Sequence, residues 1–275
     1  MDKKLIYINS IAVALLAVFA TTSGLFWKGL YMHDTVSGVA QMMGQDLITL
    51  IVAVPILLGS LYLISRGSLR GYLIWMGTMF YFLYSYASMS FLTSYNQLFL
   101  VYVALFSISL YAFIYGLLSM DVKTIKKSVS PGVTIKIAGV FSIIMGLLLA
   151  LMWLSMIIES LLTGTAPAAL ESYTTLVIQA LDLGVLVPAA FIAGLLILKG
   201  KQWGYAIISI LLVKVSLLGT AILSMILFMV RNGVSVAVVQ VLLFGVVTVA
   251  GILIATAFYK NINGSTNDFK VFKLN

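Results

Sequence analysis

Residues 204–230 have the sequence GYAIISILLVKVSLLGTAILSMILFMV, in which Lys214 is the only charged side chain. A helix crosses a bilayer with about 20 consecutive apolar residues, so this stretch is long enough to span one. Its apolar residues do not alternate with polar residues, as the strands of a membrane β-barrel would require. The stretch therefore predicts a transmembrane helix that carries one lysine near the middle of the membrane.

Seven further stretches share this apolar character. Of the 275 residues, 62% are hydrophobic and only 9% are charged, which is too few charges to cover a soluble domain. The sequence therefore predicts an all-α integral membrane protein with eight transmembrane helices and no soluble domain. The expected spans are 5–27, 46–65, 71–91, 97–120, 134–158, 174–198, 204–230 and 234–259.

An internal repeat relates the two halves of the chain. At an offset of 133 residues, Pro55 aligns with Pro188, and the string basic-Gly-x3-Gly-Tyr at 66–72 aligns with the same string at 199–205. Matches of proline, glycine and tyrosine in one register are far rarer by chance than apolar matches. Four spans per unit is an even number, so the two repeats are expected to be parallel. The expected units are 1–132 and 133–259, with a short cytoplasmic tail at 260–275.

The basic residues concentrate at one end of this arrangement, and only Lys28 and Arg231 fall at the other. Positively charged loops stay in the cytoplasm, so both termini are expected to be cytoplasmic in a cell (plasma or inner) membrane. This distribution accounts for the net charge of +8 without a nucleic-acid partner. The basic residues at the expected cytoplasmic end are Lys3, Lys4, Arg66, Arg70, Lys123, Lys126, Lys127, Lys136, Lys199, Lys201, Lys260, Lys270 and Lys273.

The composition excludes several kinds of chemistry. The chain has no cysteine and one histidine, which excludes disulfides, thiol catalysis, thiolate metal sites and a bis-histidine heme. In the first outer loop, His33 and Asp34 are weak metal candidates, because they lack the spacing of a metal-binding motif. We expect no metal and no cofactor. The whole of the loop 28–45 is interpreted as an interfacial cap.

Polar residues inside the expected spans are the main indication of function. A lysine at the membrane centre costs about 2.5 to 3.5 kcal/mol, so Lys214 is expected to face protein or water. Asp182, in the outer half of the preceding span, is the expected counter-ion. The pair would serve either to fix helix packing or to bind a proton, an ion or a polar solute. The equivalent positions of the first half hold Tyr81 and Thr49, and the nearest acid there is Asp46.

Further candidates extend this region. The hydroxyls of Tyr81 and Tyr84 need partners inside a membrane, either through packing of aromatic helices or in a ligand cavity. Gln179 and Gln240 would extend a polar cavity toward the outer face. The candidate residues for binding a substrate or ion are Lys214, Asp182, Tyr81, Tyr84, Asp46, Gln179 and Gln240.

These features favour a transporter or channel for a small solute or ion, with a site near the membrane midplane at the repeat interface. The expected partners are membrane lipids and the solute or ion, and an oligomer is compatible with the sequence. The alternatives are an intramembrane enzyme or lipid-binding protein, an accessory membrane subunit, and a pigment with a retinal Schiff base on Lys214. An enzyme is less expected, because no clear acid and base constellation is present. A transporter would lose flux in Lys214→Met while remaining folded.

Overall fold

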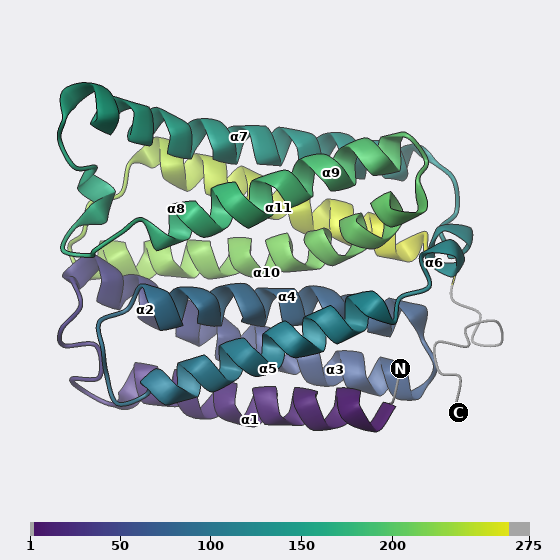
Figure 1. Ribbon diagram of the computed structural model, residues 1–275, viewed down its shortest axis with the longest axis horizontal. Coiled ribbons are helices and arrows are strands. Elements are labelled where there is room, and N and C mark those ends of the chain that lie inside the picture. The colour runs from purple at the N-terminus through teal and green to yellow at the C-terminus, as the bar shows by residue number, and fades with distance from the viewer. Residues whose placement is uncertain (1–2, 264–275) are drawn as a thin grey trace.

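The structure is a computed structural model that describes residues 3–263. Long helices lie side by side along one axis and form a bundle (Figure 1). No β-strand occurs within the described range, so the chain is all-α as predicted. The α-helices are α1 (Lys3–Phe26), α2 (Val36–Ile48), α3 (Val54–Ser65), α4 (Leu69–Phe91), α5 (Phe99–Leu118), α6 (Val122–Ser128), α7 (Val133–Thr163), α8 (Val177–Leu181), α9 (Val187–Leu198), α10 (Gln202–Arg231) and α11 (Val238–Lys260).

Within the described range, seven helices are long and apolar enough to cross a membrane. Two of them combine shorter pieces, because a π-helical segment joins α2 to α3 and another joins α8 to α9 without a break. The chain is therefore a helical, multi-pass membrane protein, as the composition predicts. The seven helices are Lys4–Phe26, Val36–Ser65, Phe99–Leu118, Val133–Thr163, Val177–Leu198, Gln202–Arg231 and Val238–Lys260.

Helix α4 corresponds to the expected span 71–91 but is not among the seven. It is rich in tyrosine, serine and glycine, which lowers its apolar character. Eighteen of its 23 residues are buried, and it contacts α3, α5 and α10. Figure 1 shows it near the centre of the bundle. Because neighbouring helices surround α4, its small residues and hydroxyls are packed against protein.

Helix α2 corrects one expectation from the sequence. The interpretation of 28–45 as a cap was wrong for its second part, because α2 begins at Val36 and continues into the span expected from 46. The side chain of Thr35 accepts a hydrogen bond from the first turn and caps the helix. The glycines of this stretch favoured a loop, but one of them, Gly44, instead allows α2 to lie close against α10.

Two helices of the bundle are irregular at equivalent positions. A π-helical segment begins at Thr49 and another at Asp182, 133 residues later. Each is followed at once by α3 or α9, with Pro55 or Pro188 at the second position. Proline has no N–H to donate, so the regular helical hydrogen-bond pattern is interrupted in this region. Both helices are therefore irregular next to the prolines that the 133-residue offset aligns.

The turns that follow these helices also correspond. Gly67 has φ of 74° and Gly200 has φ of 64°, in the left-handed region that favours glycine. The next helix then passes very close to the one before. A Cβ on Gly71 would lie 2.4 Å from a side-chain atom of α3, and one on Gly204 would lie 2.2 Å from a main-chain atom of α9. The string shared by 66–72 and 199–205 is therefore explained by the left-handed turn and by the close approach of the two helices that it joins.

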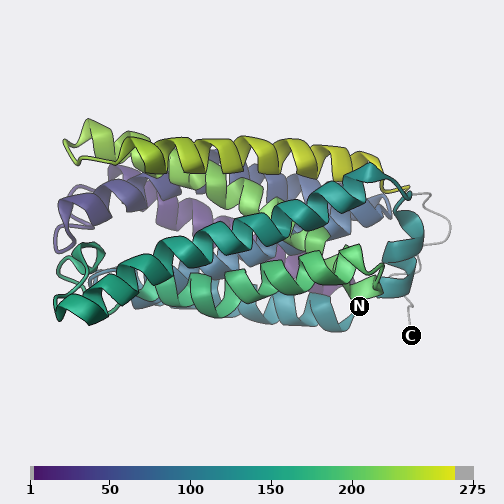
Figure 2. The ribbon, with the colours of Figure 1, turned by 90° about the horizontal axis from the view of Figure 1, so that it is seen from above.

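The two ends of the bundle differ in charge. The start of α1 and the end of α11 lie at the same end (Figures 1 and 2). We call this end the basic end, because the basic residues cluster in and beside its segments. Two of the basic residues expected there, Lys270 and Lys273, lie outside the described residues. The basic end comprises 66–68, 119–132, 199–201 and 261–263. The opposite, distal end comprises the loops 27–35, 92–98, 164–176 and 232–237.

Candidate functional site

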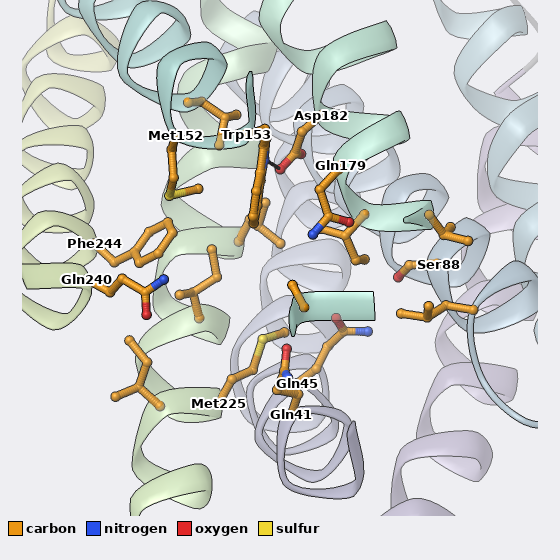
Figure 3. Close-up of a pocket in the computed structure, with 18 of the residues that line it drawn as sticks. Gln41, Gln45, Ser88, Met152, Trp153, Gln179, Asp182, Met225, Gln240 and Phe244 are labelled. Atoms are coloured by element: carbon orange, nitrogen blue, oxygen red, sulfur yellow. Dashed lines mark hydrogen bonds between the residues drawn. The ribbon is translucent and has the colours of Figure 1, made fainter. Parts of the chain in front are cut away.

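A cavity of about 480 Å³ extends inward from the distal end (Figure 3). Its walls come from α2 and α4 of the first half and from α7, α8, α10 and α11 of the second. The volume lies in the range of small-molecule sites. Most of the lining is apolar, and seven of the 13 methionines contribute to it. These are Met42, Met89, Met145, Met152, Met156, Met225 and Met229.

Four glutamines provide hydrogen-bonding groups in this largely apolar space. Gln179 of α8 and Gln240 of α11 line the cavity, where the sequence placed them as candidates. Gln41 and Gln45 of α2 line it as well, and Figure 3 shows all four amides around the same space. These last two were missed, because their stretch was interpreted as a loop. Their exposure to the cavity depends on α2 being helical.

Asp182 lines the cavity and is 5% exposed. Tyr84 donates a hydrogen bond of 2.6 Å to its Oδ1, and the indole N–H of Trp153 donates one of 2.9 Å to its Oδ2 (dashed in Figure 3). Hydrogen bonds to an ionised carboxylate are the stronger kind. Trp153 was not among the expected site residues, since it lies within an apolar span with no polar neighbour in sequence.

Lys214 lies beside Tyr84 but does not line the cavity. Its side chain is 0% exposed, and Nζ has no hydrogen-bond partner among the described residues. Nζ lies 3.8 Å from the centroid of the Tyr84 ring and 5.7 Å from that of Phe80. Lys214 Nζ therefore makes no direct hydrogen bond to Asp182, its expected counter-ion. Tyr84 connects the two charges, since its ring contacts the lysine and its hydroxyl bonds the aspartate.

Two of the candidate residues lie elsewhere in the bundle. Tyr81 is fully buried and shares a hydrogen bond of 2.7 Å with the hydroxyl of Thr49. Asp46 is also buried, and its Oδ2 accepts a hydrogen bond of 2.8 Å from Tyr31. Neither Tyr81 nor Asp46 lines the cavity. The structure thus separates these first-half residues from the site around Asp182.

The distal loops are held together by Asp34. Its carboxylate accepts hydrogen bonds from the N–H of Ser94, at 2.9 Å, and from the hydroxyl of Tyr173, at 3.1 Å. Burial, with a contribution from Asp34, raises the pKa of Tyr173 to about 12, so its hydroxyl stays protonated at neutral pH. His33 is exposed, and no group of three His, Cys, Asp or Glu side chains that could hold a metal occurs in residues 3–263. Asp34 therefore connects the first distal loop to the loops that contain Ser94 and Tyr173.

The hydrogen bond from Tyr84 is expected to contribute more to stability than the one between Tyr81 and Thr49. Tyr84→Phe should lower the free energy of unfolding by about 2 kcal/mol, because a hydrogen bond to a charged group is worth about 1.5 to 3 kcal/mol. Tyr81→Phe removes a bond between neutral groups and should cost about 1 kcal/mol. Reversible denaturation in detergent micelles measures both. Equal losses would show that the hydrogen bond from Tyr84 to Asp182 is no stronger than one between two hydroxyl groups.

The chain matches no known protein family, and neither curated protein sequences nor solved structures contain a significant match to it. The class of the protein follows from its helices, which are those of a multi-pass membrane protein.

Proposed function

We propose that this protein is a membrane transporter for a small, largely apolar organic solute, which binds in the cavity between α2, α4, α7, α8, α10 and α11. The cavity itself carries the proposal, because it has the volume of a small-molecule site and includes hydrogen-bonded Asp182 in its wall. A bare ion would not need seven methionines and four glutamines around it. A cavity of this kind suits an organic molecule with an apolar body and a polar group.

The proposed architecture has eight spans in two parallel repeats. The eighth span is α4, which adds to the seven long apolar helices named above. In support, α3 and α9 have bounds exactly matched at the 133-residue offset, as do the π-helical segments before them. Helices α4 and α10 occupy equivalent positions in the two halves and contact each other. In transporters built from repeats, the substrate site lies at the interface between them. The cavity takes its walls from both halves.

A difference between the halves favours a single site. In the first half, α2 packs against α10 along its length. The equivalent stretch of the second half is 169–181, of which only Val177–Leu181 is α-helical. Residues of this stretch line the cavity instead of filling it with a helix. Loss of regular helix in one repeat thus supports one asymmetric binding site.

The charge distribution supports an orientation for transport. Basic segments remain in the cytoplasm, so we assign the basic end and both termini to that side of a plasma or inner membrane. The cavity then opens to the outside, so Asp182 in its wall is reached from there. The arrangement corresponds to the outward-facing state of a transporter.

A protein that binds a hydrophobic ligand without moving it would share the cavity but produce no flux.

Filling the cavity is expected to abolish transport. The assay uses proteoliposomes and three labelled phenyl compounds that cross lipid slowly: benzyltrimethylammonium, phenylmethanesulfonate and phenylalanine. At least one should enter faster than into protein-free liposomes. Met225→Trp places a larger side chain in the cavity and should reduce this uptake at least about tenfold, equivalent to about 1.4 kcal/mol.

The matched control is Met32→Trp, because Met32 is 71% exposed in a distal loop and does not line the cavity. Its uptake should equal that of the wild type. Undiminished uptake by Met225→Trp would show that the solute takes another route. Binding of a probe without any uptake would identify a ligand-binding protein instead.

A further inference from the structure

We infer that the solute is an organic cation and that Asp182 is its charged partner, an inference that rests on the cavity's proposed role as a solute site. The cavity lining contains two charged side chains, Asp182 and Glu171, and both are acidic. None of the basic residues in the described range lines it, although the chain has 16 basic and only eight acidic residues. A low-dielectric cleft lined by one sign of charge attracts ligands of the opposite sign.

Aromatic rings add a second reason to expect a cation. Trp153 lies at Asp182, and Phe244 lines the α11 side of the cavity (Figure 3). Aromatic faces attract ammonium groups, most of all quaternary ones, when water is excluded. The methionines around them are flexible and polarizable, so they adapt to an apolar body of irregular shape. Ring faces beside a buried carboxylate form a site for an ammonium group.

Asp182 retains the capacity to bind such a group. Each of its oxygens accepts one hydrogen bond, from Tyr84 or from Trp153, whereas a carboxylate offers about four lone-pair positions. The hydrogen bonds fix its orientation, and its position in the lining leaves it in contact with the cavity. An anionic solute has no comparable partner, because Lys214 is fully buried outside the lining.

Lys214 is the internal counter-charge of this carboxylate. Its Nζ lies 3.8 Å from the centroid of the Tyr84 ring, whose hydroxyl donates a hydrogen bond to the same carboxylate. A solute cation and Lys214 therefore share one negative charge. Removing the lysine charge should strengthen binding of a cation and leave binding of a neutral molecule of the same shape unchanged. This difference between the two ligands separates an effect of charge from a loss of folding, which would weaken binding of both.

The experiment measures binding of tritiated benzyltrimethylammonium to the protein in lipid nanodiscs by equilibrium dialysis. Neopentylbenzene, its neutral isostere, and phenylmethanesulfonate serve as competitors. The wild type should bind the cation more tightly than either competitor. Lys214→Met should bind the cation about three- to tenfold more tightly, and adding Asp182→Asn should then weaken binding at least about tenfold, the equivalent of about 1.4 kcal/mol.

The control variant is Glu159→Gln, because Glu159 is an exposed acid near the distal end of α7 that does not line the cavity. It should leave cation binding unchanged. If the isostere or the anion binds as tightly as the cation, and Met225→Trp blocks that binding, the cavity stands and the assignment to cations is wrong. Weaker cation binding by folded Lys214→Met would also overturn it. If none of the three compounds binds the wild type, both proposals fail.

Discussion

Asp182→Asn is expected to lower the free energy of unfolding by about 3 to 5 kcal/mol, the typical cost of leaving a buried charge without its partner. Asparagine has one carbonyl oxygen, so either Tyr84 or Trp153 loses an acceptor. The charge of Lys214 would then lie buried beside two aromatic rings only. Lys214→Met should behave differently, because Asp182 keeps both hydrogen bonds and an ammonium without a hydrogen-bond partner is removed. We expect no loss of stability from it.

A double-mutant cycle on reversible unfolding tests the coupling of the two charges. In the Lys214→Met background, Asp182→Asn should cost at least about 1 kcal/mol less than in the wild type, since no lone lysine charge remains. Asp121→Asn is the control, because this exposed residue caps α6 and asparagine caps as well. Additive effects of the two substitutions would show that Lys214 and Asp182 do not interact across the Tyr84 ring.

The helices could be predicted because a membrane imposes a simple requirement. Apolar length alone located the helices, since lipid cannot satisfy an exposed main chain. The start of α2 could not be located in this way. This helix contains Gly38 and Gly44 with several polar residues, and its helical state depends on packing against α10. The order of apolar and polar residues along one segment does not reveal which other helix packs against it.

The site could be predicted only in part. Depth along the helices placed Lys214 and Asp182 near each other, and the amide groups of Gln179 and Gln240 were visible as polar residues in apolar spans. Depth does not determine how a helix is rotated about its axis. The π-helical segment that begins at Asp182 adds a further change of register, so a regular helical period does not give the facing side chains. For this reason the position of Tyr84 between the two charges was not predicted.

The contact between α2 and α10 should be the other most sensitive point of the structure. A Cβ on Gly44 would lie 2.5 Å from the Cα of Met225 and 2.6 Å from its main-chain nitrogen. Main-chain atoms inside a helix cannot move aside as a flexible side chain does. Gly44→Ala should therefore cost about 1 to 3 kcal/mol, and Gly44→Leu about 3 kcal/mol or more, because overpacking forces the helices apart.

Thermal unfolding in detergent measures this loss against Gly59→Ala, a glycine in α3 with no atom within 4 Å of its added Cβ. Alanine favours a helix by up to about 1 kcal/mol over glycine, so the control should be neutral or stabilised. Because α2 presents Gln41 and Gln45 to the cavity, displacing it should also weaken benzyltrimethylammonium binding in protein that remains folded. Wild-type stability in Gly44→Ala would mean that α2 does not form this wall of the cavity.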